Sequence, residues 1–488
     1  MSVQTSDYKQ AAKDSIKSLH VFLQNMWPVL YASDPLIDNW HIKFLCDFIQ
    51  DQFFAWLNGK EFHRHVIINV PPGTSKSTIF SVMFPLWCWL HKPDMVIFST
   101  CYGEVIIDQS LKSKRIFKSE KFQYYFQGYF ESKFGHKMYL IKDTEKWWTN
   151  NYGGERQTMT TTGASTGRHC HWILSDDPMS KTESYSDAKR LTCHNFNDKT
   201  LPTRRKEPTR VPTYQIMQRL HHDDTTAHEL GKPSKKIHHI VLPAKTGLVD
   251  VKPARLAKYY VDGHMDINRL GPQALHDFKV DLGSADFNGQ YMQSPVEPGG
   301  NIVKTAWFQY CDLEEVPSHI VFDLWIDGAY TKKTENDPTG LMVAGYDYVT
   351  NRIYVRHFHS AWMELYELLN FLPEYCKLHG LDNQSRVFVE PKASGHDIIS
   401  MLRKETVLSP IEIKGKLVSD GKYARLGVAA PKIESGKWWV VRGNWNAEYT
   451  NQLSMYPRHG LDEAVDTSGY AANRYFDFDD DDAVTRQN

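Results

Sequence analysis

The chain has 488 residues, and its 57 Lys and Arg against 58 Asp and Glu leave a formal net charge of −1, which points to no partner by itself. A chain of this length is expected to fold as two or three domains rather than around one core. No stretch approaches the ~20 consecutive apolar residues of a membrane helix, and the first residues lack the apolar core of a signal peptide. The seven cysteines are scattered without CxxC spacing, so we expect a reducing compartment and neither a disulfide framework nor a zinc site.

The first half of the chain alternates short β-rich runs with segments of helical length. The runs lie at 65–70, 94–99, 138–141, 171–175, 213–217 and 237–242. This alternation predicts a mostly parallel sheet covered by helices.

The first run leads into HVIINVPPGTSKST, residues 65–78. A strand, a turn carrying Lys76 and Ser77, and a helix form the P-loop arrangement, in which the backbone N–H groups and the lysine hold phosphates and the hydroxyl ligates Mg²⁺. The standard spacing asks for glycine where Val70 and Ser75 stand, so Ser75 must adopt the turn without glycine's freedom. The alternative is a Lys-Ser pair at an ordinary helix start.

A second motif, HWILSDDP at 171–178, supports the P-loop interpretation. Its apolar run ends in Asp176 and Asp177, 100 residues after Lys76. In P-loop NTPases a strand-end Asp holds Mg²⁺, and a second acid can orient and deprotonate the attacking water. Asp-Asp-Pro also occurs in ordinary turns, but the two motifs together predict an ATPase that uses ATP and Mg²⁺.

The chain changes character after this α/β pattern. Residues 232–300 are rich in Gly, Pro and polar residues with few strand signals, as in a small lid or linker subdomain. From about 301, three β-rich runs follow one another, and then come a helix (about 362–379), the strand RVFVE and a helix (about 395–404). This is the order of an RNase H-like core.

Three separated acids mark the second region. Asp327 ends its first β-rich run, Glu390 ends RVFVE, and Asp462 opens the last helical segment with Asp466 one turn later. Such carboxylates can bridge two Mg²⁺ or Mn²⁺ about 3.5–4 Å apart for phosphodiester cleavage. A single strand-end acid is commonly solvent-facing, but the ordered set predicts a two-metal nuclease site.

We therefore expect an α/β protein with four parts. They are a P-loop NTPase domain with a RecA/ASCE-like parallel sheet (1–231), a lid or linker subdomain (232–300), an RNase H-like nuclease domain (301–476) and an acidic disordered tail (477–488). Local basic clusters are permissive of phosphate-backbone binding. Two of them comprise Arg204, Arg205, Lys206 and Arg210, and Lys232, Lys235 and Lys236.

These motifs, in this order, resemble the large terminase subunit of tailed bacteriophages. The resemblance covers nearly the whole chain and includes VPPGTSKST, TGRHCHWILSDDP, IMQRLHHDD, GQYMQSPVEPGGNIVK, WIDGAY, VEPKASG and DEAVD. It implies an N-terminal ATPase that drives double-stranded viral DNA through a portal into a procapsid, and a C-terminal endonuclease that cuts concatemeric DNA.

The resemblance also implies partners and a location. The partners are the portal protein, a small terminase subunit and further copies of the chain in a ring on the procapsid, with no membrane. The location is the cytoplasm of the infected bacterial host and, transiently, the portal vertex, but not the mature virion.

Roles for single residues follow from the same resemblance. Asp176 is the Mg²⁺ ligand with Ser77, and Asp177 takes the catalytic acid position, where many relatives carry glutamate. Gln218 and Arg219 fall at a coupling motif, where many relatives have Thr before Arg, and Arg219 is expected at the nucleotide. The residues expected to bind ATP phosphates are Pro72, Gly73, Thr74, Ser75, Lys76, Ser77 and Thr78.

Two further expectations concern the nucleotide's surroundings. A ring motor needs an arginine from the neighbouring subunit, for which Arg168 is the first candidate and Arg156 the second. Trp40 and His41 are expected near the adenine, although simple packing of this pair is an alternative.

Two other classes of function remain open. A helicase-nuclease or translocase-nuclease of DNA repair or defence would share both sites, but a helicase needs a second RecA-like lobe, for which 232–300 is too short. A capsid docking module with decayed sites is the other alternative, and the retained lysine and acids argue against it.

Overall fold

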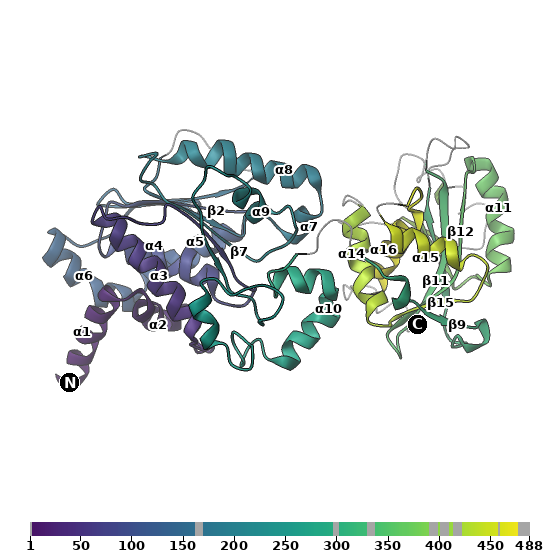
Figure 1. Ribbon diagram of the computed structural model, residues 1–488, viewed down its shortest axis with the longest axis horizontal. Coiled ribbons are helices and arrows are strands. Elements are labelled where there is room, and N and C mark those ends of the chain that lie inside the picture. Colours follow the sequence, from purple (N-terminus) through teal and green to yellow (C-terminus); the bar gives the residue numbers. More distant parts are fainter. Residues whose placement is uncertain are drawn as a thin grey trace. The chain divides into compact units, whose positions relative to one another are not determined.

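The computed structural model describes residues 2–161, 169–295, 302–328, 337–389, 399–400, 409–412, 422–456 and 459–476. Arg168, Glu390 and the acidic tail at 477–488 lie outside these residues. The chain divides into two compact units (Figure 1), unit one with Met1–Leu275 and Asp286–Glu297, and unit two with His276–Ala285 and Pro298–Asn488. No helix in the described residues combines the length and apolar character of a membrane span.

Unit one is built on an eight-stranded sheet with the order β3-β4-β5-β2-β6-β7-β1-β8. Six neighbouring strands, β5, β2, β6, β7, β1 and β8, are parallel. At the β5 edge, β4 and then β3 add antiparallel strands. The strands are β1 (His65–Asn69), β2 (Val96–Cys101), β3 (Leu140–Asp143), β4 (Trp147–Asn150), β5 (Glu155–Thr160), β6 (Trp172–Asp176), β7 (Thr213–Met217) and β8 (His238–Val241). The predicted parallel sheet is confirmed, and β4 and β5 are strands that the sequence did not predict.

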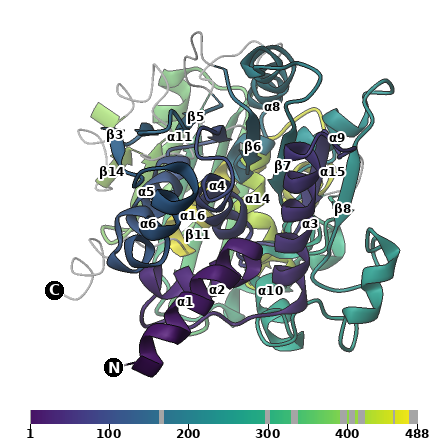
Figure 2. The same ribbon diagram turned by 90° about the vertical axis from the view of Figure 1, so that its left-hand side faces the viewer.

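Helices pack on both faces of this sheet (Figures 1 and 2). Figure 2 looks at the N-terminal helices α1 and α2, which pack against one another. The helices are α1 (Ser2–Lys17), α2 (Leu19–Leu30), α3 (Trp40–Leu57), α4 (Phe84–Trp89), α5 (Val105–Lys118), α6 (Glu120–Phe134), α7 (Lys181–Ser184), α8 (Asp187–Asn195) and α9 (Thr225–Leu230). Helix α10 (Pro272–Gln290) is shared, because its residues 276–285 belong to unit two.

Aromatic side chains join the helices to the sheet at the edge where β6 begins. Phe53 of α3 meets Trp87 of α4 edge-on, with ring centroids 5.5 Å apart, and also contacts Trp172 at the start of β6. All three side chains are completely buried. Burying each large ring contributes a few kcal/mol, roughly 25 cal/mol per Å² of apolar surface, so this cluster fixes α4 against the sheet.

The region expected to form a lid contributes to unit one. Within 232–300, β8 pairs in parallel with β1, so this strand extends the sheet that carries the P-loop. The division of the chain into four parts stays a prediction.

Unit two contains a seven-stranded sheet with the order β14-β13-β10-β11-β12-β15-β9. The strands β10, β11 and β12 are antiparallel, and β13 and β14 run parallel beside β10. The strands are β9 (Gln309–Cys311), β10 (Phe322–Asp327), β11 (Thr339–Asp347), β12 (Arg352–Ala361), β13 (Arg386–Val389), β14 (Ser409–Glu412) and β15 (Trp438–Val441). Three antiparallel strands followed by two parallel ones confirm the RNase H-like core.

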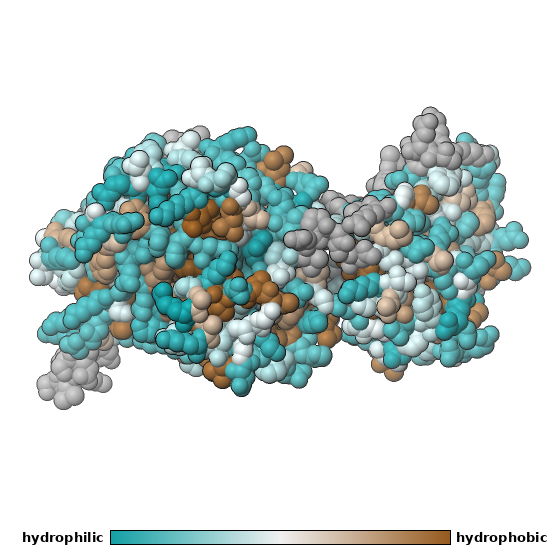
Figure 3. Space-filling view, in the orientation of Figure 1, coloured by the Kyte–Doolittle hydropathy of each residue, from teal (hydrophilic) through white to brown (hydrophobic). Residues whose placement is uncertain are grey.

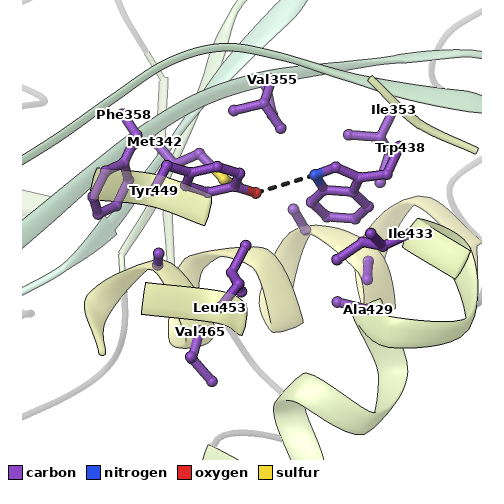
Figure 4. Packing of buried hydrophobic residues seen from close by; sticks show 14 of the residues in the cluster. Met342, Ile353, Val355, Phe358, Ala429, Ile433, Trp438, Tyr449, Leu453 and Val465 are labelled. Carbon is purple, nitrogen blue, oxygen red and sulfur yellow. Dashed lines mark hydrogen bonds between the residues drawn. The ribbon is translucent and has the colours of Figure 1, made fainter. Parts of the chain in front are cut away.

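The two faces of this sheet carry different helices because successive strand residues point to opposite sides. Leu324 and Leu341 face α11 (Leu365–Leu378). On the other face, Trp438 and Tyr449 pack among α14 (Lys422–Glu434), α15 (Asn446–Met455) and α16 (Glu463–Phe476). There the indole N–H of Trp438 donates to the Tyr449 hydroxyl at 3.1 Å, so a buried polar pair is satisfied inside the apolar core (Figure 4).

The surface seen in Figure 3 is mostly hydrophilic on both units, with apolar residues in small patches. Scattered exposed apolar residues are normal for a folded protein. The chemistry of the chain is therefore sought at its strand ends and cavities.

Candidate active sites

The P-loop turn follows the carboxyl end of β1 and uses two residues in the left-handed region. Gly73 has φ 75° and Ser75 has φ 60°. A non-glycine residue there is strained by about 1 kcal/mol or more, which confirms that Ser75 takes the turn without glycine's freedom. The Thr74 hydroxyl donates to the Pro71 carbonyl at 2.8 Å and braces the turn from inside.

The helix after the turn begins with a wide, π-helical segment. It spans Thr78–Met83 and closes with a bond from the Phe84 N–H to the Ile79 carbonyl, five residues back. Ser81 lies within it, and its hydroxyl donates to Asp176 Oδ2 at 2.7 Å. Wide turns of this kind frequently occur at functional sites, and here the turn aims a hydroxyl at a strand-end acid.

Asp176 ends β6 and is completely buried. Its Oδ2 accepts from Ser81, whereas its Oδ1 has no hydrogen-bond partner among the described residues. Burial and the neighbouring Asp177 carboxylate raise the pKa of Asp176, and Lys76 opposes the shift. A buried carboxylate with one unsatisfied oxygen fits a bound cation, as expected of a Mg²⁺ ligand.

Asp177 faces the P-loop lysine. Its Oδ2 lies 3.3 Å from Lys76 Nζ, and its backbone has a φ of 43°. The Asp177 N–H donates to the Ile216 carbonyl, and its own carbonyl accepts from the Tyr102 N–H at 3.0 Å. Both neighbouring strands therefore hold this strained residue in place, which is typical of functional positions.

Lys76 has a second partner at the end of β7. Because β7 lies between β1 and β6, the residue after it comes between the P-loop and the acids. This residue is Gln218, whose Oε1 accepts from Lys76 Nζ at 2.5 Å. The adjacent Arg219 is instead paired with the buried Asp224, Nε to Oδ2 at 2.8 Å, so its contact with a nucleotide stays a prediction.

Arg156 cannot be the arginine supplied to a neighbouring subunit, and this prediction is wrong. The side chain is completely buried in β5. Its Nη2 donates to the Ser81 carbonyl at 2.6 Å and its Nη1 to the Ser99 hydroxyl at 2.5 Å, while burial lowers its pKa to about 9. Arg156 therefore braces, within its own chain, the residue that holds Asp176. The first candidate, Arg168, lies outside the described residues.

The pair expected near the adenine lies at the start of α3. The Trp40 indole N–H donates to the Met265 carbonyl at 2.9 Å and its ring stacks on Tyr259, with centroids 5.5 Å apart. His41 is completely buried, which lowers its pKa to about 4. These contacts favour packing, and contact with adenine stays a prediction. Sequence reasoning missed Arg269, whose Nη1 donates to the Gly73 carbonyl at 3.1 Å.

In unit two, a glycine lets the segments that carry the predicted acids Asp327 and Asp462 approach each other. Asp327 ends β10 and pairs in register with Gly340 of β11. A Cβ on Gly340 would stand 2.5 Å from the Glu463 Cβ, so the start of α16 lies directly against this strand end. This close approach places Asp462 at the edge where Asp327 ends its strand, and Glu390 lies outside the described residues.

Two cations of α14 enter the acidic cluster. Lys422 Nζ is paired with Asp462, and it lies 3.4 Å from Asp466 Oδ2 and 3.7 Å from Asp337 Oδ2. Arg425 Nη1 pairs with the other Asp466 oxygen at 2.5 Å. Despite partial burial, the acids raise the pKa of Lys422. Asp466 is thus completely buried between two cations, and its role as a metal ligand stays a prediction.

The carboxylates fit a divalent cation. One oxygen each of Asp337, Asp462 and Glu463 lies within 4.8 Å of the others. Burial, and then the Asp462 charge, raise the pKa of Glu463 to about 7, and its Oε1 has no hydrogen-bond partner among the described residues. Oxygen-only donor sets suit Mg²⁺ or Mn²⁺. The sequence assigned no role to Asp337, which ends no strand, or to Glu463, which directly follows a predicted ligand.

Comparisons with known proteins bear on the fold of both units. Residues 325–474 match a protein-family profile described as "Terminase RNaseH-like domain". The chain is similar in structure to the large terminase of a thermophilic bacteriophage, at 10% identity and a TM-score of 0.51, over 88% of this chain and 98% of that chain. It is also similar to the HK97 bacteriophage large terminase, at 10% identity and a TM-score of 0.39, over 94% and 99% of the two chains.

A nuclease domain solved alone is similar as well. The large terminase nuclease domain of bacteriophage SPP1 with bound Mn matches at 17% identity and a TM-score of 0.27, over 35% of this chain and 98% of that chain. No curated protein matches the chain in sequence. The chain therefore has the fold of a phage large terminase, and its residues 325–474 match the model of the terminase RNase H-like domain.

Proposed function

We propose that the chain is the motor subunit of a viral DNA-packaging machine. ATP hydrolysis in unit one drives double-stranded DNA through a portal into a procapsid, and a metal-dependent endonuclease in unit two cuts concatemeric DNA to start and end packaging. The observation that carries this proposal is the pairing of Lys76 with Asp177 and Gln218 at the sheet edge of one unit, together with an acidic cluster on an RNase H-like core in the other.

In the ATPase site, a bound nucleotide would replace the contacts that Lys76 makes with Asp177 and Gln218. Lys76 would bind the outer phosphates and release Asp177, whose freed carboxylate orients the attacking water and accepts its proton. Gln218 lies against the same lysine and would sense the terminal phosphate. Ser77 and Asp176 would hold Mg²⁺, which neutralises phosphate charge when bound.

In the nuclease site, Asp327 and Asp462 would hold the divalent cations, with Asp337 and Glu463 as additional carboxylates. When bound, two such cations activate water and stabilise the leaving oxygen of the phosphodiester. Lys422 Nζ lies among these acids and balances their charge, so its ammonium group would move aside or toward the DNA phosphate when cations bind.

The partners and location follow the same proposal. The chain would assemble as a ring on the procapsid with the portal protein and a small terminase subunit, in the cytoplasm of the infected host, and would be absent from the mature virion. Arg168 would complete the ATPase site of the neighbouring copy.

A crossed pair of variants of the full chain tests the proposal. Lys76→Ala should abolish DNA-stimulated phosphate release while Mn²⁺-dependent DNA cleavage continues. Asp327→Asn should abolish cleavage while ATP hydrolysis continues. Normal ATP hydrolysis by Lys76→Ala would disprove the P-loop assignment, and strand separation by the wild-type protein would favour a helicase-nuclease instead.

A further inference from the structure

A cavity of about 730 Å³ opens in unit one at the edge of the sheet opposite the P-loop. It lies where β1 and β8 begin, at His65 and His238, whereas the P-loop follows the other end of β1. Five residues of strand separate the two ends by about 15 Å. The volume is within the range of small-molecule sites, and the cavity is separate from the proposed ATPase site.

The cavity wall is cationic. Two basic clusters of the sequence, around Arg205 and around Lys235, meet there. The charged lining residues are Arg64, Arg205, Lys232, Lys235 and Lys236, with Glu61 and Asp198 as the acids. Lys232 is paired with Asp198 and Glu229, and Lys235 with Glu229, so these lysines have counter-ions within the protein.

The two arginines have no such counter-ion. Among the described residues, no carboxylate lies within ion-pair distance of Arg64 or Arg205. Arg64 Nη1 donates to backbone carbonyls, and Arg205 Nη2 donates to the Thr213 hydroxyl at 3.1 Å, while Arg205 Nε is buried with no partner in the described part of the chain. Burial, and next the charge of Arg64, lower the pKa of Arg205. The charge of Glu229 opposes this shift, but two neighbouring guanidinium groups without a carboxylate in ion-pair contact form a site that an anion would stabilise.

His65 adds a neutral donor between them. The ring is 6% exposed and lines the cavity. Its Nε2 accepts from Arg64 Nε at 3.0 Å, which places the imidazole proton on Nδ1, and Nδ1 has no partner among the described residues. Burial and the charges of Lys235 and Arg205 lower the pKa of His65 to about 3, so the ring stays neutral and keeps one N–H available.

We propose that this cavity binds a small phosphate-bearing anion, such as pyrophosphate or the phosphate groups of a nucleotide. Planar guanidinium groups bind phosphate oxygens in pairs, and an anion that reached the buried His65 Nδ1–H would satisfy a donor without a partner among the described residues. The stacked rings of His63 and His238, with centroids 4.0 Å apart, also line the cavity and offer a flat surface to a base. Duplex DNA carries its phosphates on the outside of a rigid helix, which cannot reach the buried His65.

The test is calorimetric titration of pyrophosphate into the full-length Lys76→Ala variant, in which the P-loop has lost its phosphate-binding lysine. We expect one binding site to remain. Adding Arg205→Gln or Arg64→Gln should weaken it roughly tenfold or more, because each removes a charge-assisted hydrogen bond. The matched control is Arg204→Gln, one position earlier, where the side chain bonds to Thr203 and does not line the cavity.

Thermal unfolding of each variant checks the fold. If Arg205→Gln unfolds, Arg64→Gln decides. Failure of pyrophosphate to bind to Lys76→Ala, or equal binding by the folded arginine variants, would overturn the proposal. Binding of a short DNA duplex that depends on Arg64 and Arg205, without binding of pyrophosphate, would assign the site to the DNA backbone and overturn it as well. The proposal does not depend on the packaging function.

Discussion

The Lys76 ammonium lies 3.3 Å from the Asp177 carboxylate, so the P-loop lysine is paired with the second strand-end acid. In the proposed ATPase site, Lys76 and Asp177 must separate before Lys76 can bind phosphate oxygens and Asp177 can orient water. Hydrolysis would then begin only when phosphate oxygens replace Asp177 as the partner of Lys76. The ion pair also keeps both charges compensated in a largely buried place.

The two strand-end acids should respond differently to removal of their charge. Asp176→Asn should weaken Mg²⁺-dependent nucleotide binding, because Asp176 offers a buried oxygen without a partner among the described residues. Asp177→Asn should bind the nucleotide at least as tightly, since the competing ion pair is gone, but slow single-turnover hydrolysis by roughly 10²–10⁴-fold. Nucleotide titration with and without Mg²⁺, followed by single-turnover assays, separates the two effects. Normal hydrolysis by Asp177→Asn would mean that another residue activates the water.

Ser81 should act through Mg²⁺ rather than through general stability. Ser81→Ala removes the hydroxyl that donates to Asp176 and should raise the Mg²⁺ concentration needed for half-maximal ATP hydrolysis. The lost hydrogen bond should also lower the free energy of unfolding by about 1–3 kcal/mol. Ser99→Ala is the matched control, because it removes the other partner of Arg156 and leaves the bond to Asp176 in place. An equal change in Mg²⁺ requirement for both variants would argue against this role of Ser81.

The close packing of α14 against α16 should depend on Gly469. A Cβ there would stand 2.6 Å from the Arg425 Cβ and 2.9 Å from its carbonyl oxygen. Gly469→Ala should push α16 away from α14 and displace Asp462, which directly precedes α16, reducing DNA cleavage and destabilising unit two by roughly 1–3 kcal/mol. Gly460→Ala, where an added Cβ meets nothing within 4 Å, should leave cleavage unchanged. Cleavage and thermal unfolding are measured for both variants, with ATP hydrolysis as a reference for unit one. Equal cleavage by the two variants would contradict the prediction.

Acid should destabilise unit one through a half-buried histidine. Burial lowers the pKa of His91 from 6.5 to about 4, so the unfolded chain binds a proton that the folded chain excludes. Stability from this group is complete above pH 6.5 and falls as the pH drops toward 4, by at most roughly 3 kcal/mol. His91→Phe, which suits the contacts with Phe54 and Trp87, should reduce this loss. Replacement of the exposed His136 by Asn is the control, and equal acid sensitivity of both variants in thermal unfolding would contradict the prediction.

The sequence could place those proposed site residues whose positions depend on local order. Lys76, Ser77 and Asp176 could be found because a strand, a turn and a helix, or a strand and its last residue, are contiguous in the chain. Strand β5 could not be found in this way, because its buried Arg156 and Gln157 interrupt the apolar pattern that marks a strand. Only the folded sheet reveals that Arg156 satisfies the carbonyl of Ser81.

The acidic cluster of unit two shows the same limit. Asp327 and Asp462 stand at element ends and could be predicted, whereas Asp337 and Lys422 reach the cluster through tertiary packing. That packing depends on Gly340 and Gly469, because the lack of a Cβ at these positions lets α16 approach β11 and α14. A glycine inside a strand or helix gives no indication, by itself, of which distant element approaches it.

The wide helical turn at Thr78–Met83 fixes the length of the chain between the P-loop and α4. Such a turn holds one residue more than an ordinary helical turn. Deleting a single residue there would restore regular helix geometry and rotate Ser81 by about 100° around the axis. Its hydroxyl would then point away from Asp176, and its carbonyl would leave the Arg156 guanidinium. This segment is therefore expected to tolerate changes of side chain more readily than any change in the number of its residues.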